Sequence, residues 1–420
     1  MSISHRTGRS ALVIGAGIVG LALAWRLRSR GMDVTVLDPA PPGEGASFGN
    51  AGSISTSAVV PLAMPGVLRK LPGMLFDPEA ALHVPMDYWL RALPWFLRFV
   101  ASARPANVAR ISAAMGALHR LAVEQHRTIA REIGAPDLIH PSGSLYLYRD
   151  AAALAKDSTD WRMRAETGTR IEELDRGGIT ALEPAVSPAY KLAQFLPDHA
   201  HCANPHRYCT TLAEALVRAG GRIERDRALR LEVEGRRIVS VTGMRANHAA
   251  DEVIVAAGAW SALLLRPLGY RIPLETQRGY HIELPSAGLG VGRCLVPSDR
   301  KVFITPMETG LRVAGTVEFG GLNRPPTPAR AELLYKDLRA VLPDADTSGS
   351  SGFWMGHRPC LPDSLPVIGP SRRYGGLWFA FGHGHLGLTA AAPTAEALAG
   401  TILGVPPNLD LETYCAERFT

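Results

Sequence analysis

The chain has 420 residues, of which 46% are hydrophobic and 20% are charged, and its formal net charge is +6. This composition is that of a globular protein, and the length exceeds what one ordinary hydrophobic core supports, so we expect two interleaved domains. The positive charge is scattered without a long basic run, which argues against nucleic-acid binding. Anionic substrates or an anionic membrane surface remain open as partners.

The five cysteines show no C-x-x-C spacing. This argues against a zinc site or an iron–sulfur cluster, so we expect no metal, and it favours free thiols in a reducing, cytoplasmic compartment. No apolar run reaches the roughly 18 to 20 residues that are needed to span a bilayer.

The front of the chain predicts a strand, a helix and a second strand at residues 11–14, 21–30 and 34–37. Three glycines with G-x-G-x-x-G spacing lie between the first strand and the helix: Gly15, Gly17 and Gly20. In this motif the first glycine permits a tight turn, the second lets the backbone approach a pyrophosphate, and the third lets the helix pack on the strand. The helix N-terminus, at Ile18 and Val19, presents its free N–H groups to the phosphates.

Asp38 closes the second strand, 23 positions after Gly15. Its carboxylate can accept hydrogen bonds from both hydroxyls of an adenosine ribose. The complete pattern therefore predicts a dinucleotide site. The alternative is a secretory signal, since His5, Arg6 and Arg9 precede the apolar run, but no small-residue cleavage site follows.

Small residues crowd the loop at 45–53, so its backbone can lie close to a flat group. Because this loop follows the dinucleotide strand, we expect it to cover the cofactor, with a plain surface loop as the alternative. The cofactor contacts predicted here are Ser47, Asn50, Ala51 and Gly52.

Residues 61–100 combine tryptophans, aliphatic residues and interleaved arginines, and six prolines prevent one long helix. Short helices with apolar faces and basic edges either rest on a membrane interface or pack on the protein's own core, and both interpretations stay open. One longer helix is expected at 107–133, where Ile111, Met115 and Leu118 recur at spacings of three and four.

An apolar strand is predicted at 251–256, and it runs into a turn of small residues. We expect the chain to return to the first sheet here and to bring its backbone close to the cofactor. The contacts expected from this part of the chain are Ala257, Gly258 and, on the adenine side, Ala228. Residues 274–284 and 301–317 have the pattern of strands in an antiparallel substrate sheet.

The C-terminal part holds two dense motifs, at 354–369 and 377–389, and the second runs into a helix at 390–403. Glycines before a helix leave N–H groups exposed at its N-terminus, which suits a polar or anionic group. The cofactor contacts predicted here are Gly382, Gly384, Leu386 and Gly387.

Together these motifs resemble the D-amino-acid oxidase superfamily of flavoproteins, and most closely the bacterial D-amino-acid and D-hydroxyproline dehydrogenases. The matching pieces span almost the whole chain in family order: the front unit, 47–52, 277–280, 358–369 and 382–387. The resemblance implies an α/β fold in which a Rossmann-type domain that binds FAD non-covalently is interleaved with an antiparallel-sheet substrate domain.

The expected domain boundaries follow from this resemblance. The FAD-binding domain would comprise residues 1–60, 195–262 and 352–420. The substrate-binding domain would comprise residues 61–194 and 263–351, with a helical insertion at about 61–133.

The resemblance also implies dehydrogenation of a Cα–H bond beside an amine, with hydride passing to N5 of the flavin. Arg358 matches the carboxylate-binding arginine of the family, and its planar fork suits a carboxylate; a structural arginine bonded to loop carbonyls is the alternative. Tyr280 is expected either to add a hydroxyl to the same carboxylate or to lie in the core, and Arg278 is a second candidate cation. His383 and His385 lie two positions apart, so only one of them need face the flavin. That histidine can bond the flavin carbonyl, contact substrate or help to remove an amine proton, and the alternative for either is a structural role.

The chain departs from many relatives at Gly49, where they carry alanine, and at His385, where they carry threonine. The His-Gly-His form resembles relatives that act on cyclic D-imino acids such as cis-4-hydroxy-D-proline. We therefore expect a D-amino or cyclic D-imino acid, such as D-proline, as substrate. Quinone or another redox partner is expected to accept the electrons, with peripheral contact at the inner face of the cell membrane. Two alternatives stay open: a related flavoenzyme acting on a 2-hydroxy acid or an N-methyl amino acid, and the FAD subunit of a larger dehydrogenase complex.

Overall fold

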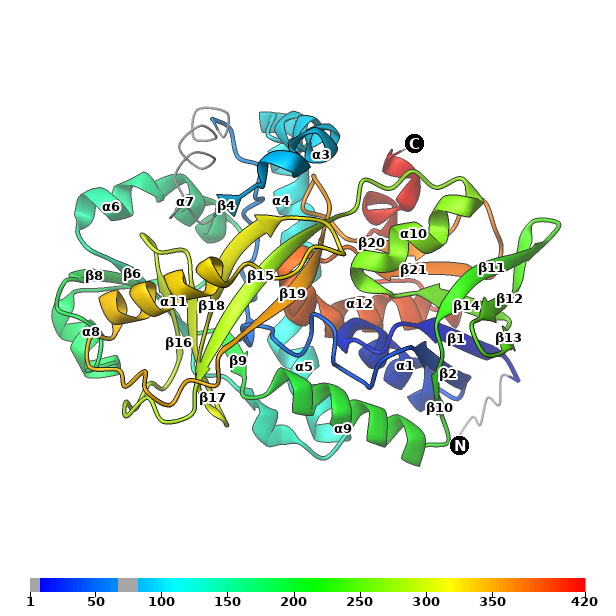
Figure 1. Ribbon diagram of the computed structural model, residues 1–420, viewed down its shortest axis with the longest axis horizontal. Coiled ribbons are helices and arrows are strands. Elements are labelled where there is room, and N and C mark those ends of the chain that lie inside the picture. Colours follow the sequence, from blue (N-terminus) through cyan, green and yellow to red (C-terminus); the bar gives the residue numbers. More distant parts are fainter. Residues whose placement is uncertain (1–7, 67–81, 420) are drawn as a thin grey trace.

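Two sheets organise the fold, and each forms the core of one lobe (Figure 1). The computed structural model describes residues 8–66 and 82–419. The first lobe is built on a six-stranded sheet that is parallel except at its last strand. In spatial order its strands are β10 (Arg222–Arg225), β2 (Asp33–Asp38), β1 (Ser10–Ile14), β14 (Glu252–Val255), β21 (Leu377–Phe381) and β20 (Val367–Pro370).

The strand–helix–strand unit predicted at the front of the chain is confirmed as β1, α1 and β2. Helices cover one face of the sheet: α1 (Ile18–Ser29), α5 (Ala122–Glu132), α9 (Pro205–Arg218) and α12 (Gly387–Ile402). A three-stranded ribbon and a short helix cover the other face: β11 (Ala228–Glu234), β12 (Arg237–Gly243), β13 (Asn247–Ala249) and α10 (Ser261–Leu265). A strand that is buried on both faces must be apolar throughout, which explains the unbroken apolar run at 11–14.

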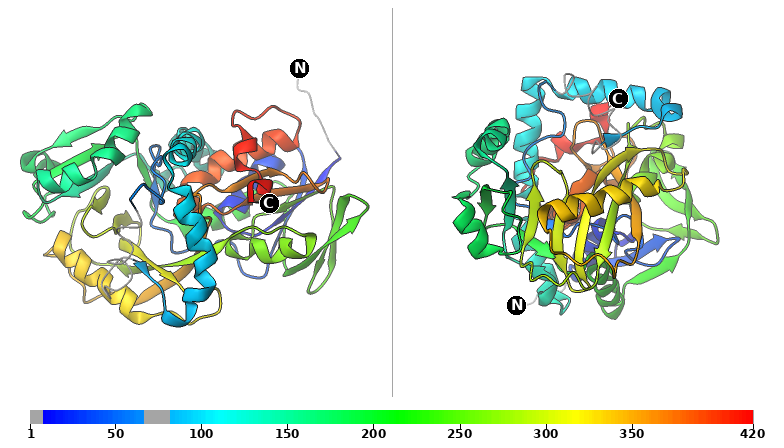
Figure 2. Two further views of the ribbon diagram at one scale, coloured as in Figure 1. Left: turned by 90° about the horizontal axis from the view of Figure 1, so that it is seen from above. Right: turned by 60° about the vertical axis from the view of Figure 1, so that its left-hand side comes forward.

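The second lobe is built on a nine-stranded mixed sheet. In spatial order it comprises β19 (Phe353–Cys360), β15 (Glu275–Leu284), β18 (Gly310–Phe319), β17 (Phe303–Met307), β16 (Cys294–Pro297), β6 (Ser144–Tyr148), β8 (Leu192–Leu196) and β7 (Glu172–Leu174), with β4 (Leu82–His83) paired to β18. Figure 2 shows α11 (Pro328–Val341) lying across one face of this sheet. Its outer part carries α6 (Ala151–Lys156), α7 (Ser158–Glu166) and α8 (Arg176–Leu182) (Figure 1).

Strand β15 shows how the nine-stranded sheet divides its side chains between two environments. Tyr280 and Ile282 join the apolar core beneath α11. Gly279 and His281 alternate to the opposite face, where they meet Arg358 and the loop at 45–53. On β15, side chains that face the cavity therefore alternate with side chains that face the core.

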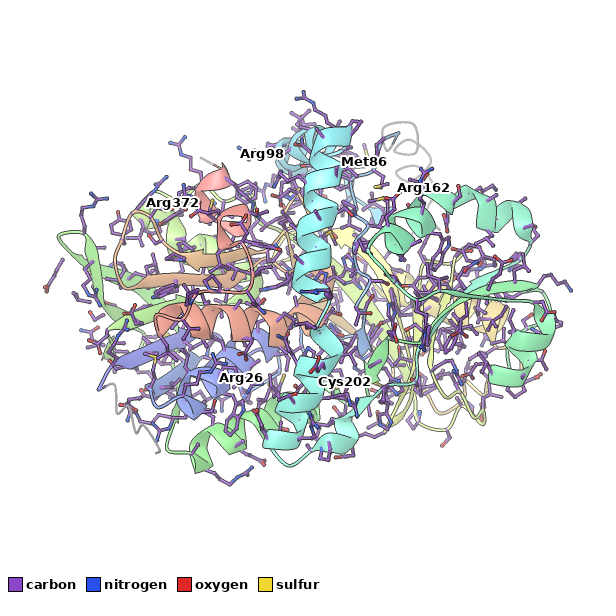
Figure 3. All side chains as sticks on the ribbon, turned by 180° about the vertical axis from the view of Figure 1, so that it is seen from behind. Arg26, Met86, Arg98, Arg162, Cys202 and Arg372 are labelled. Atoms are coloured by element: carbon purple, nitrogen blue, oxygen red, sulfur yellow. The ribbon has the colours of Figure 1, made fainter. Side chains whose placement is uncertain are left out.

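Between residues 89 and 132 the chain forms α3 (Trp89–Ser102), α4 (Pro105–His119) and α5. The prediction of one helix at 107–133 is wrong, because the chain leaves helical geometry at Leu121, which has a ψ of 11°. Figure 3 shows α4 and α5 running across the back of the molecule, and both pack on α12 of the first lobe. Helix α3 packs on the second lobe, against Phe319. Residues 67–81, which belong to the segment singled out at 61–100, lie outside the described residues.

Strand pairing assigns β19 to the second lobe. Its residues pair with β15 from Glu275↔Cys360 to Ile282↔Phe353. The expected boundary at residue 352 placed this strand with the FAD-binding domain. The pairing shows instead that the chain passes from the second lobe to the first after Cys360. A third, small sheet joins β3 (Ser53–Ile54), β9 (Ala200–Cys202) and β5 (Ile139–His140). Within the described residues, none of the helices has both the length and the apolar character required to cross a bilayer.

Candidate functional site

The first strand ends in a turn that only glycine can form. Gly15 has a φ of +117°, and a Cβ atom there would lie 2.4 Å from the carbonyl oxygen of Ala256. A Cβ atom at Gly20 would lie 2.0 Å from the carbonyl oxygen of Gly15, so this glycine sets the close packing of α1 on β1. The helix then begins after Gly17 with no acidic residue in its first turn. Its positive dipole end is thus presented without a competing carboxylate, as an anionic ligand requires.

Asp38 is held in place at the end of β2 by the backbone. Its Oδ2 atom accepts a hydrogen bond from the N–H of Ala16 at 2.7 Å, and its Oδ1 atom accepts one from the N–H of Ala40 at 2.8 Å. Burial raises the pKa of Asp38, while the two N–H donors lower it. The carboxylate is therefore fixed next to the glycine turn, where the dinucleotide motif requires it.

One cavity of about 1190 Å³ runs from the glycine turn to the inner face of the nine-stranded sheet. This exceeds the roughly 300 to 1,000 Å³ of pockets for drug-sized ligands, so the cavity has room for a dinucleotide and a second molecule. Most of the cofactor contacts predicted from sequence line it: Gly15, Gly17, Ile18, Val19, Asp38, Ser47, Asn50, Ala51, Ala228, Ala257, Gly258, Gly382, Gly384, Leu386 and Gly387. Gly20 and Gly52 are absent from its wall. Gly20 packs α1 on β1, and Gly52 has a φ of +76° in a turn against Cys202.

The loop at 45–53 is held between the two lobes. Arg312 of β18 donates from its Nη1 atom to the carbonyl oxygens of Phe48 at 3.1 Å and Asn50 at 2.8 Å. His281 of β15 donates from Nδ1 to the carbonyl oxygen of Gly49 at 3.1 Å. Ser47 accepts a hydrogen bond from the N–H of Ile18 at 3.0 Å, which ties the same loop to α1.

Gly49 is required by a neighbouring tryptophan. A Cβ atom at Gly49 would lie 2.0 Å from the ring of Trp354, which lines the cavity and stacks on His281 at 5.2 Å between centroids. The absence of a side chain at Gly49 is therefore matched to the indole of Trp354. A further glycine, Gly356, makes room for the same ring, because a Cβ atom at this position would lie 1.9 Å from the Trp354 indole.

Arg358 on β19 is positioned by an irregularity in the adjacent strands. The register of β15 and β18 shifts between Arg278 and Tyr280, and Thr316 takes a φ of +54° at this bulge. The carbonyl oxygens of Thr316 and Gly315 accept hydrogen bonds from Arg358 at 2.8 Å and 3.3 Å. Gly279 leaves space for the guanidinium, since a Cβ atom there would lie 2.3 Å from its Cζ atom.

The charge of Arg358 is not neutralised by a protein carboxylate within the described residues. Burial lowers the pKa of this guanidinium, and the side chain lines the cavity. Arg358 thus bonds to carbonyl oxygens, as the structural alternative expected, and it also keeps a positive charge available to an anion in the cavity. A carboxylate is the partner that would complete it.

Tyr280 and Arg278 are directed into the core below the sheet. The Tyr280 hydroxyl donates to Glu318 at 2.5 Å and accepts from the N–H of Thr327 at 2.9 Å. Arg278 forms a fully buried ion pair with Glu318 at 3.4 Å and donates to the carbonyl oxygen of Pro325 at 2.5 Å. The structure therefore does not bring the Tyr280 hydroxyl or the Arg278 guanidinium beside Arg358, because both side chains point to the α11 face of β15.

The two histidines of the C-terminal motif have different surroundings. The Nε2 atom of His383 is hydrogen-bonded to the Thr394 hydroxyl of α12 at 3.0 Å, and this side chain is buried. His385 is exposed to the cavity. Desolvation of the imidazole and, secondarily, the positive charge of Arg358 lower the pKa of His385 to about 4. The imidazole is therefore neutral near pH 7. His385 is therefore the histidine of this pair that can meet a ligand beside Arg358.

Part of the cavity wall was missed by sequence reasoning. Ser55 and Ser57 line it and share a hydrogen-bonded histidine, because both hydroxyls lie within 3.1 Å of the Nε2 atom of His199. Tyr146 and Arg164 line it from β6 and α7. The alternation of residues 144–148 was an available signal for Tyr146, because it sets one face of a strand. Nothing in the pattern around Arg164 indicates a ligand site.

The turn at Gly15, the start of α1 without an acidic residue, the anchored Asp38 and the size of the cavity fit FAD. Fold and site together define a two-domain flavoprotein in which a dinucleotide domain faces a substrate sheet. The model of the DAO family, described as FAD dependent oxidoreductase, matches residues 10–401. The chain belongs to this family, and its cofactor is FAD.

Comparison with individual proteins agrees with this assignment. The chain is 35% identical to a D-amino-acid oxidase of Bradyrhizobium diazoefficiens over 98% of its own length and 99% of the relative's. It is also 35% identical to D-amino acid dehydrogenase 2 of Ralstonia nicotianae, over 97% of this chain and 99% of the relative. In fold it resembles the crystal structure of L-proline dehydrogenase from P. horikoshii, with a TM-score of 0.76, 18% identity and coverage of 98% and 97%. The expected fold class is confirmed.

The burial of His383 predicts an acid-sensitive stability. Burial lowers its pKa to about 3, so the native state binds fewer protons than the unfolded state below pH 6.5. The contribution of the buried, neutral His383 to the free energy of unfolding is complete above pH 6.5 and is lost as the pH falls toward 3. Between pH 7 and pH 4.5 we expect the wild type to lose about 2 to 3 kcal/mol more unfolding free energy than His383→Asn. Urea unfolding of the FAD-free protein at both pH values measures this, and equal losses in the two proteins would show that His383 is not desolvated.

Proposed function

We propose that this flavoenzyme dehydrogenates a D-amino acid or a cyclic D-imino acid at the carbon beside its amine. One observation carries the proposal: within the described residues Arg358 has no carboxylate partner, and it lies in the FAD cavity beside the neutral His385. A cation and a neutral imidazole are the two groups that the carboxylate and the amine of such a substrate need. The printed names of the two relatives at 35% identity, a D-amino-acid oxidase and a D-amino acid dehydrogenase, support this substrate class.

The roles of the residues follow from their chemistry. The guanidinium of Arg358 holds the α-carboxylate in its plane, which fixes the orientation of the Cα–H bond. His385, neutral at pH 7, can accept a hydrogen bond from the amine and can hold a proton that leaves it. FAD, when bound, supplies the two-electron acceptor. Trp354 covers the loop at 45–53 and limits access of water to this part of the cavity.

The resemblance at Gly49 and His385 favours D-proline and cis-4-hydroxy-D-proline among these substrates. The test is anaerobic bleaching of the purified yellow protein by D-alanine, D-proline, cis-4-hydroxy-D-proline, lactate, sarcosine and the L-enantiomers. We expect bleaching by D-amino or D-imino acids alone, and release of FAD into the supernatant on acid precipitation. Bleaching only by lactate or sarcosine would contradict the proposal. Flavin that stays in the protein pellet would contradict non-covalent binding.

Arg358→Lys should lower kcat/KM by an amount equivalent to about 2 to 4 kcal/mol, because lysine keeps the charge but loses the planar fork. Flavin content should stay at the wild-type value. Arg162→Lys, which changes an exposed arginine outside the cavity wall, is the matched control and should leave kcat/KM unchanged. Wild-type kinetics in Arg358→Lys would place the carboxylate anchor on another residue.

We further infer that the electrons leave at a membrane surface, to quinone or another carrier. Helix α3 is amphipathic: Trp95 and Phe96 pack on Phe319 of β18. The opposite side exposes an apolar stripe that begins just before the helix: Met86, Leu90, Leu93 and Leu97. The exposed fraction is 85% at both Met86 and Leu90. The tryptophans therefore pack on the protein's own core, as the alternative interpretation of this segment held, while the side chains of the stripe on the other side are exposed.

Met86 of the stripe and Arg98 of α3 lie close together at the upper edge of the molecule in Figure 3. Apolar side chains flanked by arginine suit the interface of an anionic bilayer. This supports a cytoplasmic enzyme in peripheral contact with the inner face of the membrane. The two relatives named as oxidase and dehydrogenase are equally similar to the chain, so the acceptor rests on this surface alone.

The double substitution Leu90→Glu and Leu97→Glu should abolish co-flotation of the wild-type protein with anionic liposomes, because two charges would enter the apolar stripe. Val405→Glu, at an exposed apolar residue away from α3, is the control and should still float. Peroxide is measured during turnover of the same samples. A wild-type protein that stays out of the liposome fraction at low salt and forms one peroxide per substrate would be an oxidase without a membrane partner.

A further inference from the structure

The cavity continues past the substrate position into a region that the mechanism does not use. Its wall there is formed by β6, by α7 and by the segment at 296–303. Side chains from α7 close this end, and among them Trp161 and Arg164 face Tyr146 of β6. The region belongs to the same cavity as Arg358, so a molecule bound beside FAD can extend into it.

The guanidinium of Arg164 is held in position by two aromatic rings. Its Cζ atom lies 4.7 Å from the ring centroid of Trp161 and 5.5 Å from that of Tyr146. The two rings meet edge to face, with centroids 5.2 Å apart and planes at 89°. Stacking of this kind fixes the plane of an arginine and desolvates one of its faces.

The polar edge of Arg164 is incompletely satisfied. Its Nε atom is buried and has no hydrogen-bond partner. Asp157 lines the same region but accepts a hydrogen bond from the Tyr148 hydroxyl at 3.0 Å. Asp160 lines it as well. A buried donor without a partner costs free energy, which a ligand acceptor would recover.

We propose that Arg164 binds a second carboxylate, carried on the side chain of the substrate whose α-carboxylate is held by Arg358. The proposal rests on the proposed function. Two fixed guanidinium groups in one cavity with largely apolar walls favour a dianion over a monoanion, because each cation gains a partner and the cavity focuses their field. The substrate class is then the dicarboxylic D-amino acids. D-proline and its 4-hydroxy derivative, which the resemblance at Gly49 and His385 favours, would be the poorer substrates because their distal parts carry no charge.

Isosteric substrate pairs isolate the distal charge. D-glutamate and D-glutamine differ only in this group, as do D-aspartate and D-asparagine, and D-2-aminoadipate extends the chain by one carbon. For the wild-type holoenzyme we expect kcat/KM to favour the best acid over its amide by about tenfold or more. Arg164→Met should lower kcat/KM for that acid about 10- to 100-fold and should change the value for its amide less than about threefold.

Arg162→Met is the matched control, because Arg162 is exposed on the same helix and its loss changes the net charge equally (Figure 3). It should leave the preference for acids intact. Arg164→Lys, which keeps the charge, should retain part of the preference and serves if the methionine variant loses FAD or folds poorly. Equal kcat/KM values for acid and amide in the wild type, or equal losses for both in Arg164→Met, would overturn the proposal.

A binding measurement separates this proposal from the proposed function. Glutarate should raise the melting temperature of the holoenzyme more than pentanoate does, and Arg164→Met should remove the difference. Bleaching by neutral D-amino acids together with no glutarate effect would overturn the second-carboxylate site and leave the function standing. A glutarate effect with no bleaching by any D-amino acid would support the site and overturn the function.

Discussion

Three backbone carbonyl groups in the loop at 45–53 hold the two lobes together at the site. Arg312 donates to two of them and His281 to the third, so strands of the second lobe grip a loop that leaves the first. Arg312 is itself buried, and burial lowers its pKa while Glu283 at 3.4 Å raises it. The hydrogen bonds to these carbonyl oxygens also reduce the free-energy cost of burying the Arg312 guanidinium, which would be high without acceptors. The position of the substrate sheet over the dinucleotide domain depends on this contact.

The reactive end of the cavity is built from departures from regular structure. The bulge at Thr316 turns two carbonyl groups toward Arg358, and Gly279 leaves room for the guanidinium that they hold. Gly49 and Gly356 leave room for Trp354 in the same way. Each irregularity weakens a strand locally, and each places a side chain that a flat, regular sheet could not accommodate.

The sheet also separates reactive from structural charge. On the α11 side, Glu318 forms an ion pair with Arg278 and accepts a hydrogen bond from Tyr280, so that the two opposite charges lie together within the core. On the cavity side, Arg358 donates to carbonyl oxygens, and Arg164 lies against the rings of Tyr146 and Trp161 and is hydrogen-bonded to Tyr146. Arginines on opposite faces of one sheet thus differ in their capacity to bind an anion. An arginine that already pairs with a carboxylate has its charge balanced, whereas one without such a partner can bind an anionic ligand.

The local sequence by itself determined the dinucleotide half of the protein. Gly15, Gly20 and Asp38 act through turn geometry, helix packing and a short-range hydrogen bond, all of which are set within one strand–helix–strand unit. The substrate half was decided by tertiary structure. Period-two alternation was enough to show that Arg278 and Tyr280 share a face of β15, but which face met the cavity depended on α11, which lies some 50 residues away. Likewise, the position of Arg164 depends on the packing of α7 against β6. The partners of such a cation come from tertiary packing and follow no spacing pattern in the sequence.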